Sequence, residues 1–293
     1  MKHLLIFFTG TLFLMSCRHS DKKIVERNRN KDTAVKRIAT VKHTNDTLAI
    51  PDDTVPKVII PDSAIQAGED NVDSTSKIKI VEETSYNAQD SVGPKDAKLD
   101  WKGIFYNKGN YYIKPTKIHF TKEHSEFDDD DKPEQKTGWR LTCAVKDSCF
   151  SLISGVDNLV TGNLKIVKLK PFYYAGQKQE FKYEGITYTL YSTGAKRNGV
   201  IYNLKFFLMA NVKGNIFNQL IKSIGNNIES SNKGGESNYQ MYLAFIGDID
   251  GDKIPDFIVK EFGYPFESTG LYLSKPAGNN AIVKLVGYLY TSD

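Results

Sequence analysis

The chain has 293 residues, of which 40% are hydrophobic and 25% are charged, and these proportions are typical of globular proteins. A chain of this length can bury the core of one domain or of two small ones. Its formal net charge of +4 is small and dispersed along the sequence, which argues against a nucleic-acid-binding protein.

Residues 1–17 have the pattern of a secretory signal peptide. Met1-Lys2-His3 is a basic start, residues 4–15 are almost entirely apolar, and the small residue Ser16 precedes Cys17. The apolar run is too short to cross a bilayer, which needs roughly 20 residues. We therefore expect a leader that is removed, with the mature chain beginning at Cys17.

The end of this leader also suggests an anchor. Leu14-Met15-Ser16-Cys17 resembles the bacterial lipobox, although that pattern prefers a smaller residue where Met15 stands. The resemblance implies that Cys17 is lipidated, and more than one acyl chain anchors a protein stably to a membrane. Arg18 follows, without the aspartate that retains enterobacterial lipoproteins in the inner membrane. The resemblance thus implies a bacterial outer-membrane lipoprotein, periplasmic-facing or surface-exposed; the alternative is an ordinary signal peptide with an incidental cysteine.

Residues 18–100 are predicted to form a disordered tether. The segment is polar with scattered prolines, it contains neither Trp nor Phe, and Tyr86 is its only aromatic residue besides histidine. So few apolar side chains cannot offset the entropy lost on ordering. We therefore place the folded domain at residues 101–293, with sub-lobes 101–170 and 171–293 as an open possibility.

From Trp101 onward the sequence is rich in Tyr, Phe, Ile and Val with frequent alternation, which predicts strands. The predicted strands span residues 111–120, 139–145, 150–154, 164–169, 180–183, 186–191, 200–209, 240–246, 257–260, 271–274 and 282–290. Glu184-Gly185 is typical of a tight hairpin turn. Residues 216–224 fit either one short helix or one face of a strand.

These segments predict a mainly β fold of antiparallel sheets, sandwich or barrel-like, with at most one or two short helices. A propeller is not expected, because the sequence has no repeat at a fixed period.

Cys143 and Cys149 are predicted to form a disulfide. An isolated cysteine pair in an oxidising compartment favours a bridge. The five residues between them include turn-forming types, and adjacent hairpin strands would bring the Cα atoms within the ~4.4–6.8 Å that a disulfide requires. A catalytic thiol is less favoured, because no histidine is close in the sequence.

Residues 247–259 carry the pattern that points most directly to a chemistry. Asp248, Asp250, Asp252 and Asp256 are closely spaced in a short loop, and such carboxylates repel one another unless a hard cation neutralises them. Gly251 permits a tight turn. The spacing predicts a Ca²⁺ site; the alternative is a solvated acidic turn without metal.

The loop lacks the glycine and the final glutamate of an EF-hand, since Lys253 and Val259 occupy those positions. It instead resembles the calcium loop of FG-GAP and VCBS-type repeats. The matching residues are Gly247, Asp248, Asp250, Gly251, Asp252 and Asp256. The resemblance implies that a structural Ca²⁺ is held by the side chains of Asp248, Asp250, Asp252 and Asp256 and the backbone carbonyl of Ile254.

That family has a second glycine where this chain has Lys253, so we expect a reduced affinity for calcium. The motif occurs once, and residues 101–293 are similar to uncharacterised lipoproteins of Bacteroidota that end in one such strand pair.

These features favour a lipid-anchored cell-envelope protein whose calcium-stabilised, β-rich domain is a binding or structural module for a protein or carbohydrate partner. Tyr111-Tyr112 and Phe172-Tyr173-Tyr174 could form a binding face, or could simply cover sheets. The alternative is a secreted-side hydrolase with structural calcium and a dispersed catalytic site. A pocket with convergent carboxylates or a Ser/His pair would favour it. No residue is assigned a catalytic role.

Overall fold

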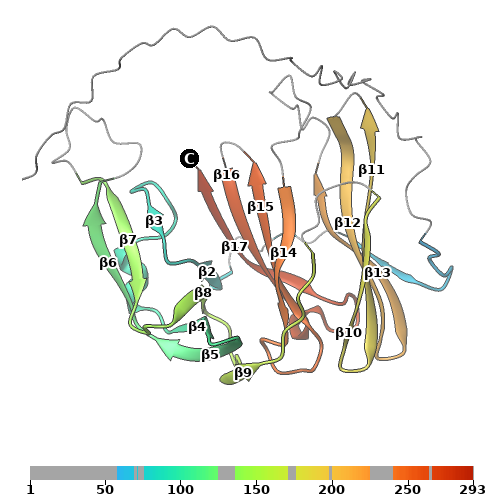
Figure 1. The fold of residues 1–293 in the computed structure, drawn as a ribbon, viewed down its shortest axis with the longest axis horizontal. Coiled ribbons are helices and arrows are strands. Elements are labelled where there is room, and N and C mark those ends of the chain that lie inside the picture. Colours follow the sequence, from blue (N-terminus) through green and yellow to red (C-terminus); the bar gives the residue numbers. More distant parts are fainter. Residues whose placement is uncertain are drawn as a thin grey trace, which may run out of the picture. The chain divides into compact units, whose positions relative to one another are not determined.

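The computed structural model describes residues 58–68, 71, 76–124, 136–170, 176–197, 200–224, 240–263 and 266–292. These residues lie in one compact unit and form seventeen strands and two short 3-10 helices (Figure 1). The predicted leader, the lipidation site Cys17 and most of the predicted tether lie outside the described residues, as does the aromatic run 172–174.

The strands form four sheets, each named here after one of its strands. The β12 sheet contains, in spatial order, β1 (Ile65–Ala67), β13 (Asn215–Ile224), β12 (Val200–Val212), β11 (Ile186–Arg197) and β10 (Lys178–Tyr183). The β15 sheet contains β14 (Gln240–Gly247), β15 (Asp256–Gly263), β16 (Phe266–Leu273) and β17 (Lys284–Ser292).

The other two sheets are built largely from the first half of the described chain. The β4 sheet contains β2 (Lys79–Val81), β8 (Ser148–Ser154), β4 (Trp101–Asn107), β5 (Asn110–Thr116) and β9 (Gly162–Leu164). The β7 sheet contains β3 (Ser85–Tyr86), β7 (Gly138–Cys143) and β6 (Ile118–Glu123). The two short helices are η1 (Pro94–Lys98) and η2 (Lys275–Ala277).

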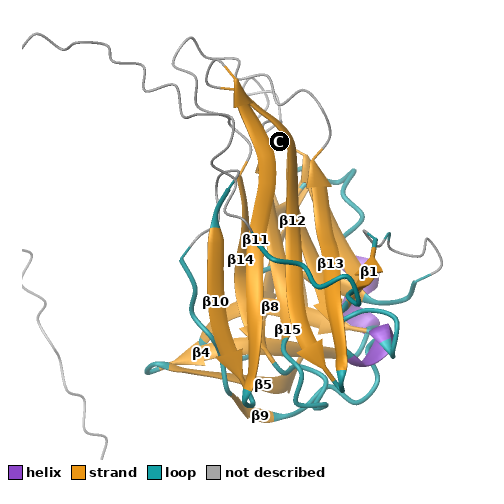
Figure 2. Cartoon of the chain, turned by 90° about the vertical axis from the view of Figure 1, so that its right-hand side faces the viewer, coloured by secondary structure: helices purple, strands orange, loops and turns teal. Residues whose placement is uncertain are grey.

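The predicted fold class is confirmed. Among the described residues the strands pair antiparallel except for β1 with β13, and no sheet closes on itself. The long strands β11, β12 and β13 lie side by side in Figure 2. Residues 216–224, for which helix and strand were both open, form most of β13.

The β15 sheet buries side chains on both faces. Phe257 on β15 contacts Phe181 of the β12 sheet, with ring centroids 6.4 Å apart. Phe245 on β14 contacts Tyr111 of the β4 sheet at 5.8 Å. Because successive strand residues point to opposite faces, a strand buried on both faces needs an unbroken apolar run, as in Phe257-Ile258-Val259. The two hydrophobic cores thus share one sheet, and the described residues on both sides of position 170 belong to one compact unit.

The prediction that the tether extends to residue 100 is wrong. Strand β2 pairs with β8, β3 pairs with β7, and the side chains of Ile80, Val81 and Tyr86 are only 1%, 1% and 2% exposed. Trp101 donates its indole N–H to the carbonyl of Asp96 at 2.8 Å. The few apolar residues of this segment complete sheets whose other strands come later in the chain, so local composition underestimates their order.

Local patterns predicted the second half of the chain best. In the predicted hairpin Tyr183 pairs with Ile186, and Glu184 and Gly185 have φ of 45° and 82°, the left-handed values that a type I′ turn requires. The predicted strand 164–169 is wrong beyond its first residue, since Ile166 forms only a single bridge to Gly247. Residues 111–120 form two strands in different sheets, β5 and β6.

Candidate functional site

The acidic loop connects β14 to β15 and closes with the pair Gly247 and Asp256. Gly251 and Lys253 have φ of 82° and 69°, both left-handed. A Cβ atom at Gly251 would lie 2.8 Å from a methyl group of Val160, so glycine is required there for space as well as conformation. Lys253 adopts the left-handed conformation without that freedom, at a cost of roughly 1–2 kcal/mol.

Three of the four predicted carboxylates come together in this loop. Asp248, Asp250 and Asp256 each place an oxygen within 4.8 Å of the others. Asp250 is 5% exposed and Asp256 is fully buried. Among the residues that the structure describes, no lysine or arginine forms an ion pair with any of the three.

Asp248 orders the backbone of the loop. Its Oδ1 accepts hydrogen bonds from the N–H of Gly251 at 2.6 Å and of Asp252 at 3.2 Å, and its Oδ2 accepts one from Lys253 at 2.9 Å. The N–H of Asp248 donates to the hydroxyl of Tyr183 at 3.1 Å. The turn is therefore built from its own hydrogen bonds, and the carboxylates are held close together.

Asp256 has a donor at each of four acceptor positions. Its Oδ2 accepts from the N–H groups of Ile249 and Asp250 at 2.5 and 3.0 Å, and its Oδ1 from the N–H and hydroxyl of Ser274 at 2.7 and 3.0 Å. Burial, together with the charge of Asp250, raises the pKa of Asp256 well above its usual value despite these donors.

Asp250 is the carboxylate with a vacant acceptor. Its Oδ2 accepts the N–H of Lys275 at 2.9 Å, whereas its Oδ1 is buried without a hydrogen-bond partner. Burial raises the pKa of Asp250, and the charges of Asp252 and Asp248 add to the effect. A buried carboxylate oxygen without a donor costs free energy that a cation could offset.

Asp252 and Ile254 lie around Ser274 instead. Asp252 Oδ1 accepts from the N–H of Ile254 at 2.8 Å and lies 2.9 Å from Ser274 Oγ, and the carbonyl oxygen of Ile254 is 3.4 Å from the same hydroxyl. Ser274 Oγ thus has three oxygen neighbours but a single hydrogen to donate. Ser274 could not be identified from the sequence, because nothing in the loop indicates a partner that follows β16, two strands further along the chain.

The oxygen-only donor set fits a hard cation. Calcium takes six to eight oxygen ligands in flexible geometry, and carboxylates and backbone carbonyls are its usual protein ligands. Asp248, Asp250 and Asp256 supply a compact group of such oxygens, and Asp252 and Ile254 offer two more beside Ser274. The predicted ligand set is therefore present in the loop, although its members do not all converge on one point.

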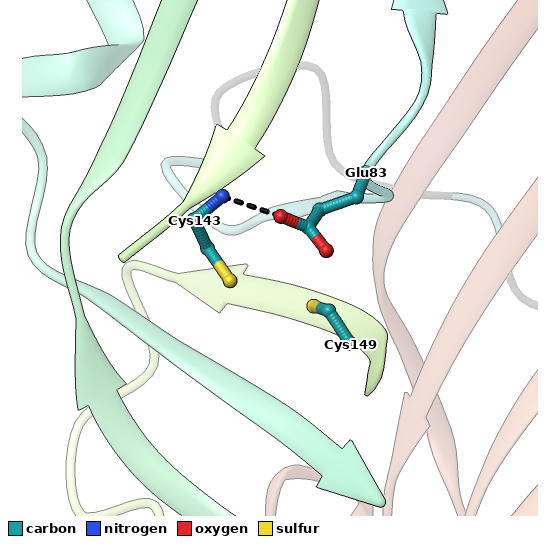
Figure 3. A group of neighbouring side chains, drawn as sticks. All are labelled: Glu83, Cys143 and Cys149. Carbon is teal, nitrogen blue, oxygen red and sulfur yellow. Dashed lines mark hydrogen bonds between the residues drawn. The ribbon is translucent and has the colours of Figure 1, made fainter. Parts of the chain in front are cut away.

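The predicted disulfide between Cys143 and Cys149 is not formed; both residues are free thiols. Cys143 ends β7, and Cys149 lies on β8 in a different sheet, so the connecting residues pass between sheets and do not close a hairpin. The two sulfurs still face each other, with the carboxylate of Glu83 beside them (Figure 3). Burial raises the pKa of both thiols.

A groove of about 1150 Å³ lies along β4, β5 and residues 144–147 and 153–159. Its charged lining consists of Lys77, Lys102, Lys114, Lys117, Lys146, Asp100, Asp147 and Asp157. Among the described residues that line it there is no histidine, and therefore no Ser/His pair. Its lining therefore holds five lysines against three aspartates.

The aromatic pair Tyr111-Tyr112 is divided between core and groove. Tyr111 packs edge-on against Phe150 at 6.0 Å, whereas Tyr112 lines the groove and donates its hydroxyl to Asp147. That bond raises the pKa of Tyr112 to about 12. The hydrogen bonds from Tyr112 and Asn107 lower the pKa of Asp147, which is the opposite of what a general acid needs.

No protein-family model, curated protein or solved structure matches the chain. Within the described ranges, no helix has the length and apolar character needed to cross a membrane.

Proposed function

We propose that this chain is a lipid-anchored cell-envelope protein whose β-rich domain is stabilised by calcium and binds an acidic partner in the lysine-lined groove. The anchor is Cys17, by its resemblance to the lipobox cysteine. The calcium loop and the groove are separate features of the domain, and each supports its own part of the proposal.

The vacant oxygen of Asp250 carries the calcium part of the proposal. Three close, largely buried carboxylates without an ion-pairing cation among the described residues repel one another, and Ca²⁺ would remove that repulsion. A ligand at tenfold its dissociation constant stabilises the folded state by about 1.4 kcal/mol. The effect is structural, because Asp256 bonds the loop to Ser274, the residue that follows the last residue of β16.

The groove carries the binding part. Five lysines against three aspartates give its lining an excess of positive charge, and the long aliphatic stems of lysine can also pack against a ligand. Leu99, Pro115 and Val156 add apolar surface. An acidic polysaccharide and an acidic protein segment share the chemistry that this lining recognises.

A binding measurement on the full chain with Cys17→Ser tests this function. We expect polygalacturonate or polyglutamate to bind at low ionic strength and neutral dextran not to bind. Lys114→Glu with Lys117→Glu should weaken binding about tenfold or more, since each reversal replaces attraction by repulsion. The matched control reverses two exposed lysines outside the groove, Lys205 and Lys284.

The outcomes separate the sources of the ligand. Binding of the polysaccharide alone would identify a carbohydrate partner, and binding of polyglutamate alone a protein partner. Release of new reducing ends from the polysaccharide would instead support the hydrolase alternative. Equal loss of binding in the control variant, or no binding of either polyanion, would contradict the groove assignment.

A further inference from the structure

Glu83, Cys143 and Cys149 form a second cluster of metal-ligating atoms, remote in sequence from the calcium loop. One oxygen and the two sulfurs lie within 4.8 Å of one another. All three side chains are partly buried, and the two cysteines pack against the core shared by the β4 and β15 sheets. Figure 3 shows the two sulfurs facing each other and the Glu83 carboxylate directed toward them from the segment that follows β2.

The position of Glu83 is fixed by its neighbour. Glu82 and Glu83 follow β2, and Glu82 forms an ion pair with Lys260 at 2.6 Å and accepts a hydrogen bond from Thr269 at 3.0 Å. The Glu83 carboxylate accepts the N–H of Cys143 at 2.5 Å. The two adjacent carboxylates thus have different roles. Glu82 attaches the segment that follows β2 to the β15 sheet, and Glu83 is held beside the two thiols.

No cation compensates Glu83 within the described part of the chain. The described ion pairs use Glu82, Asp96, Glu180, Glu184 and Glu261. Its carboxylate accepts the backbone N–H of Cys143, and the carbonyl of Val145 lies 3.4 Å from the Cys143 thiol as its acceptor. The cluster therefore presents sulfur and oxygen ligands around an uncompensated negative charge.

We propose that Glu83, Cys143 and Cys149 bind a zinc ion. Thiolate with carboxylate is a borderline-soft ligand set that suits Zn²⁺ and disfavours Ca²⁺ or Mg²⁺. In a tetrahedral site with Zn–S bonds of about 2.3 Å, the ligand atoms lie roughly 3.5–3.8 Å apart. The observed atoms lie within 4.8 Å of one another, so the cluster would contract by no more than about 1.3 Å to reach this geometry.

Binding releases the proton of each thiol to solvent, and the cation is then held by two thiolates and one carboxylate. A water molecule or the carbonyl of Val145 would complete four ligands. Because this site uses sulfur, it is independent of the oxygen-only loop at residues 248–256. Zinc binding would also keep both cysteines reduced, in competition with the formation of a disulfide between them.

The first test is the composition of the purified chain. With Cys17→Ser, Cys143 and Cys149 are the only thiols. We expect elemental analysis of protein purified without chelator to find one zinc per chain, and thiol titration after chelation to find both cysteines reduced. A Cys143–Cys149 disulfide in that preparation, or a chain without zinc that also fails to take up added Zn²⁺, would overturn the proposal.

The second test identifies the ligands. Added Co²⁺ should give the near-ultraviolet absorption of thiolate-to-cobalt charge transfer, and Zn²⁺ should abolish it by displacement. Cys143→Ser and Cys149→Ser should each remove most of this band. Glu83→Gln keeps the size and a hydrogen-bond acceptor for Cys143, so it should fold while weakening Zn²⁺ binding about tenfold or more.

Two matched controls separate this site from other carboxylates. Glu123→Gln changes a carboxylate outside the cluster, and Asp250→Asn changes the calcium loop; both should retain the cobalt band and the zinc affinity. A band that persists in Cys149→Ser, or zinc affinity unchanged in Glu83→Gln, would overturn the ligand assignment.

Discussion

Asp256 accepts hydrogen bonds from both the backbone N–H and the hydroxyl of Ser274, at 2.7 and 3.0 Å. This pair joins the start of β15 to the residue that follows β16 and precedes η2. With two further bonds from Ile249 and Asp250, it ties the acidic loop to the shared sheet. The loop is thus a structural part of the domain before any ion binds.

Asp256→Asn should destabilise the domain even without calcium. The amide cannot accept at all the positions that the carboxylate uses, so buried N–H groups of Ile249, Asp250 or Ser274 lose their partner. Each unsatisfied buried donor costs about 1–3 kcal/mol, and we expect a total near 3 kcal/mol. Urea unfolding in chelator measures it. Asp157→Asn, at an exposed position, is the control, and equal stability of Asp256→Asn and the parent chain would contradict this role.

The cation-free chain should lose stability as pH rises. Burial raises the pKa of Asp250 and Asp256 in the folded state, so the folded chain holds protons that the unfolded chain has already released. Stability then falls from the ordinary carboxyl range upward until the raised folded pKa is passed. Calcium favours the ionised carboxylates, and saturating Ca²⁺ should reduce this loss.

A difference measurement isolates this effect from other carboxyl groups. Unfolding free energies of the parent chain and Asp250→Asn are compared across the acid-to-neutral range in chelator. As pH rises, we expect the free energy of unfolding of Asp250→Asn to increase relative to that of the parent chain, because the variant carries no charge at this buried position. A difference that is constant with pH would show that Asp250 does not carry an elevated pKa.

Glu82→Ala should cost about 1–2 kcal/mol, because its partner Lys260 would be left half-buried without a counter-charge. The side chains of Glu82 and Lys260 are 24% and 19% exposed, and Thr269 also loses its acceptor. The matched control is Glu184→Ala, whose pair with Lys165 is 42% and 62% exposed and should contribute ~0–0.5 kcal/mol. Chemical denaturation measures both, and equal losses would contradict the structural role of Glu82.

A chain lacking residues 76–100 should fail to fold. The deletion removes β2, β3 and η1 and exposes the surfaces that Ile80, Val81, Tyr86 and Val92 cover. Each such side chain contributes about 1.5–3 kcal/mol on burial, and the sum is comparable to the stability of a whole domain. Cooperative thermal unfolding of the truncated chain, seen by circular dichroism, would contradict the assignment of this segment to the core.

Features set by neighbouring residues could be predicted from the sequence. The Glu184-Gly185 hairpin depends on two turn residues between alternating strands, and the acidic loop depends on the spacing of Asp248 to Asp256. Both are local, and both are found where they were expected. Lys253 stands where the repeats that the loop resembles have a glycine, and it adopts the left-handed conformation.

Features that depend on distant partners could not be predicted in this way. Tyr86 is buried because β3 pairs with β7, which no local composition shows. Ser274 joins the acidic loop through folding of the next strand, and Glu83 reaches Cys143 across 60 positions of sequence. The disulfide prediction assumed a hairpin between Cys143 and Cys149, whereas the chain changes sheets there.

The most direct test of the calcium-stabilised domain is thermal unfolding of the Cys17→Ser chain in chelator and in millimolar Ca²⁺. We predict an upward shift of the unfolding temperature with Ca²⁺, a smaller shift with Mg²⁺, and loss of the calcium response in Asp250→Ala. A folded chain whose unfolding temperature is unchanged by Ca²⁺, or a shift that persists undiminished in Asp250→Ala, would contradict the account.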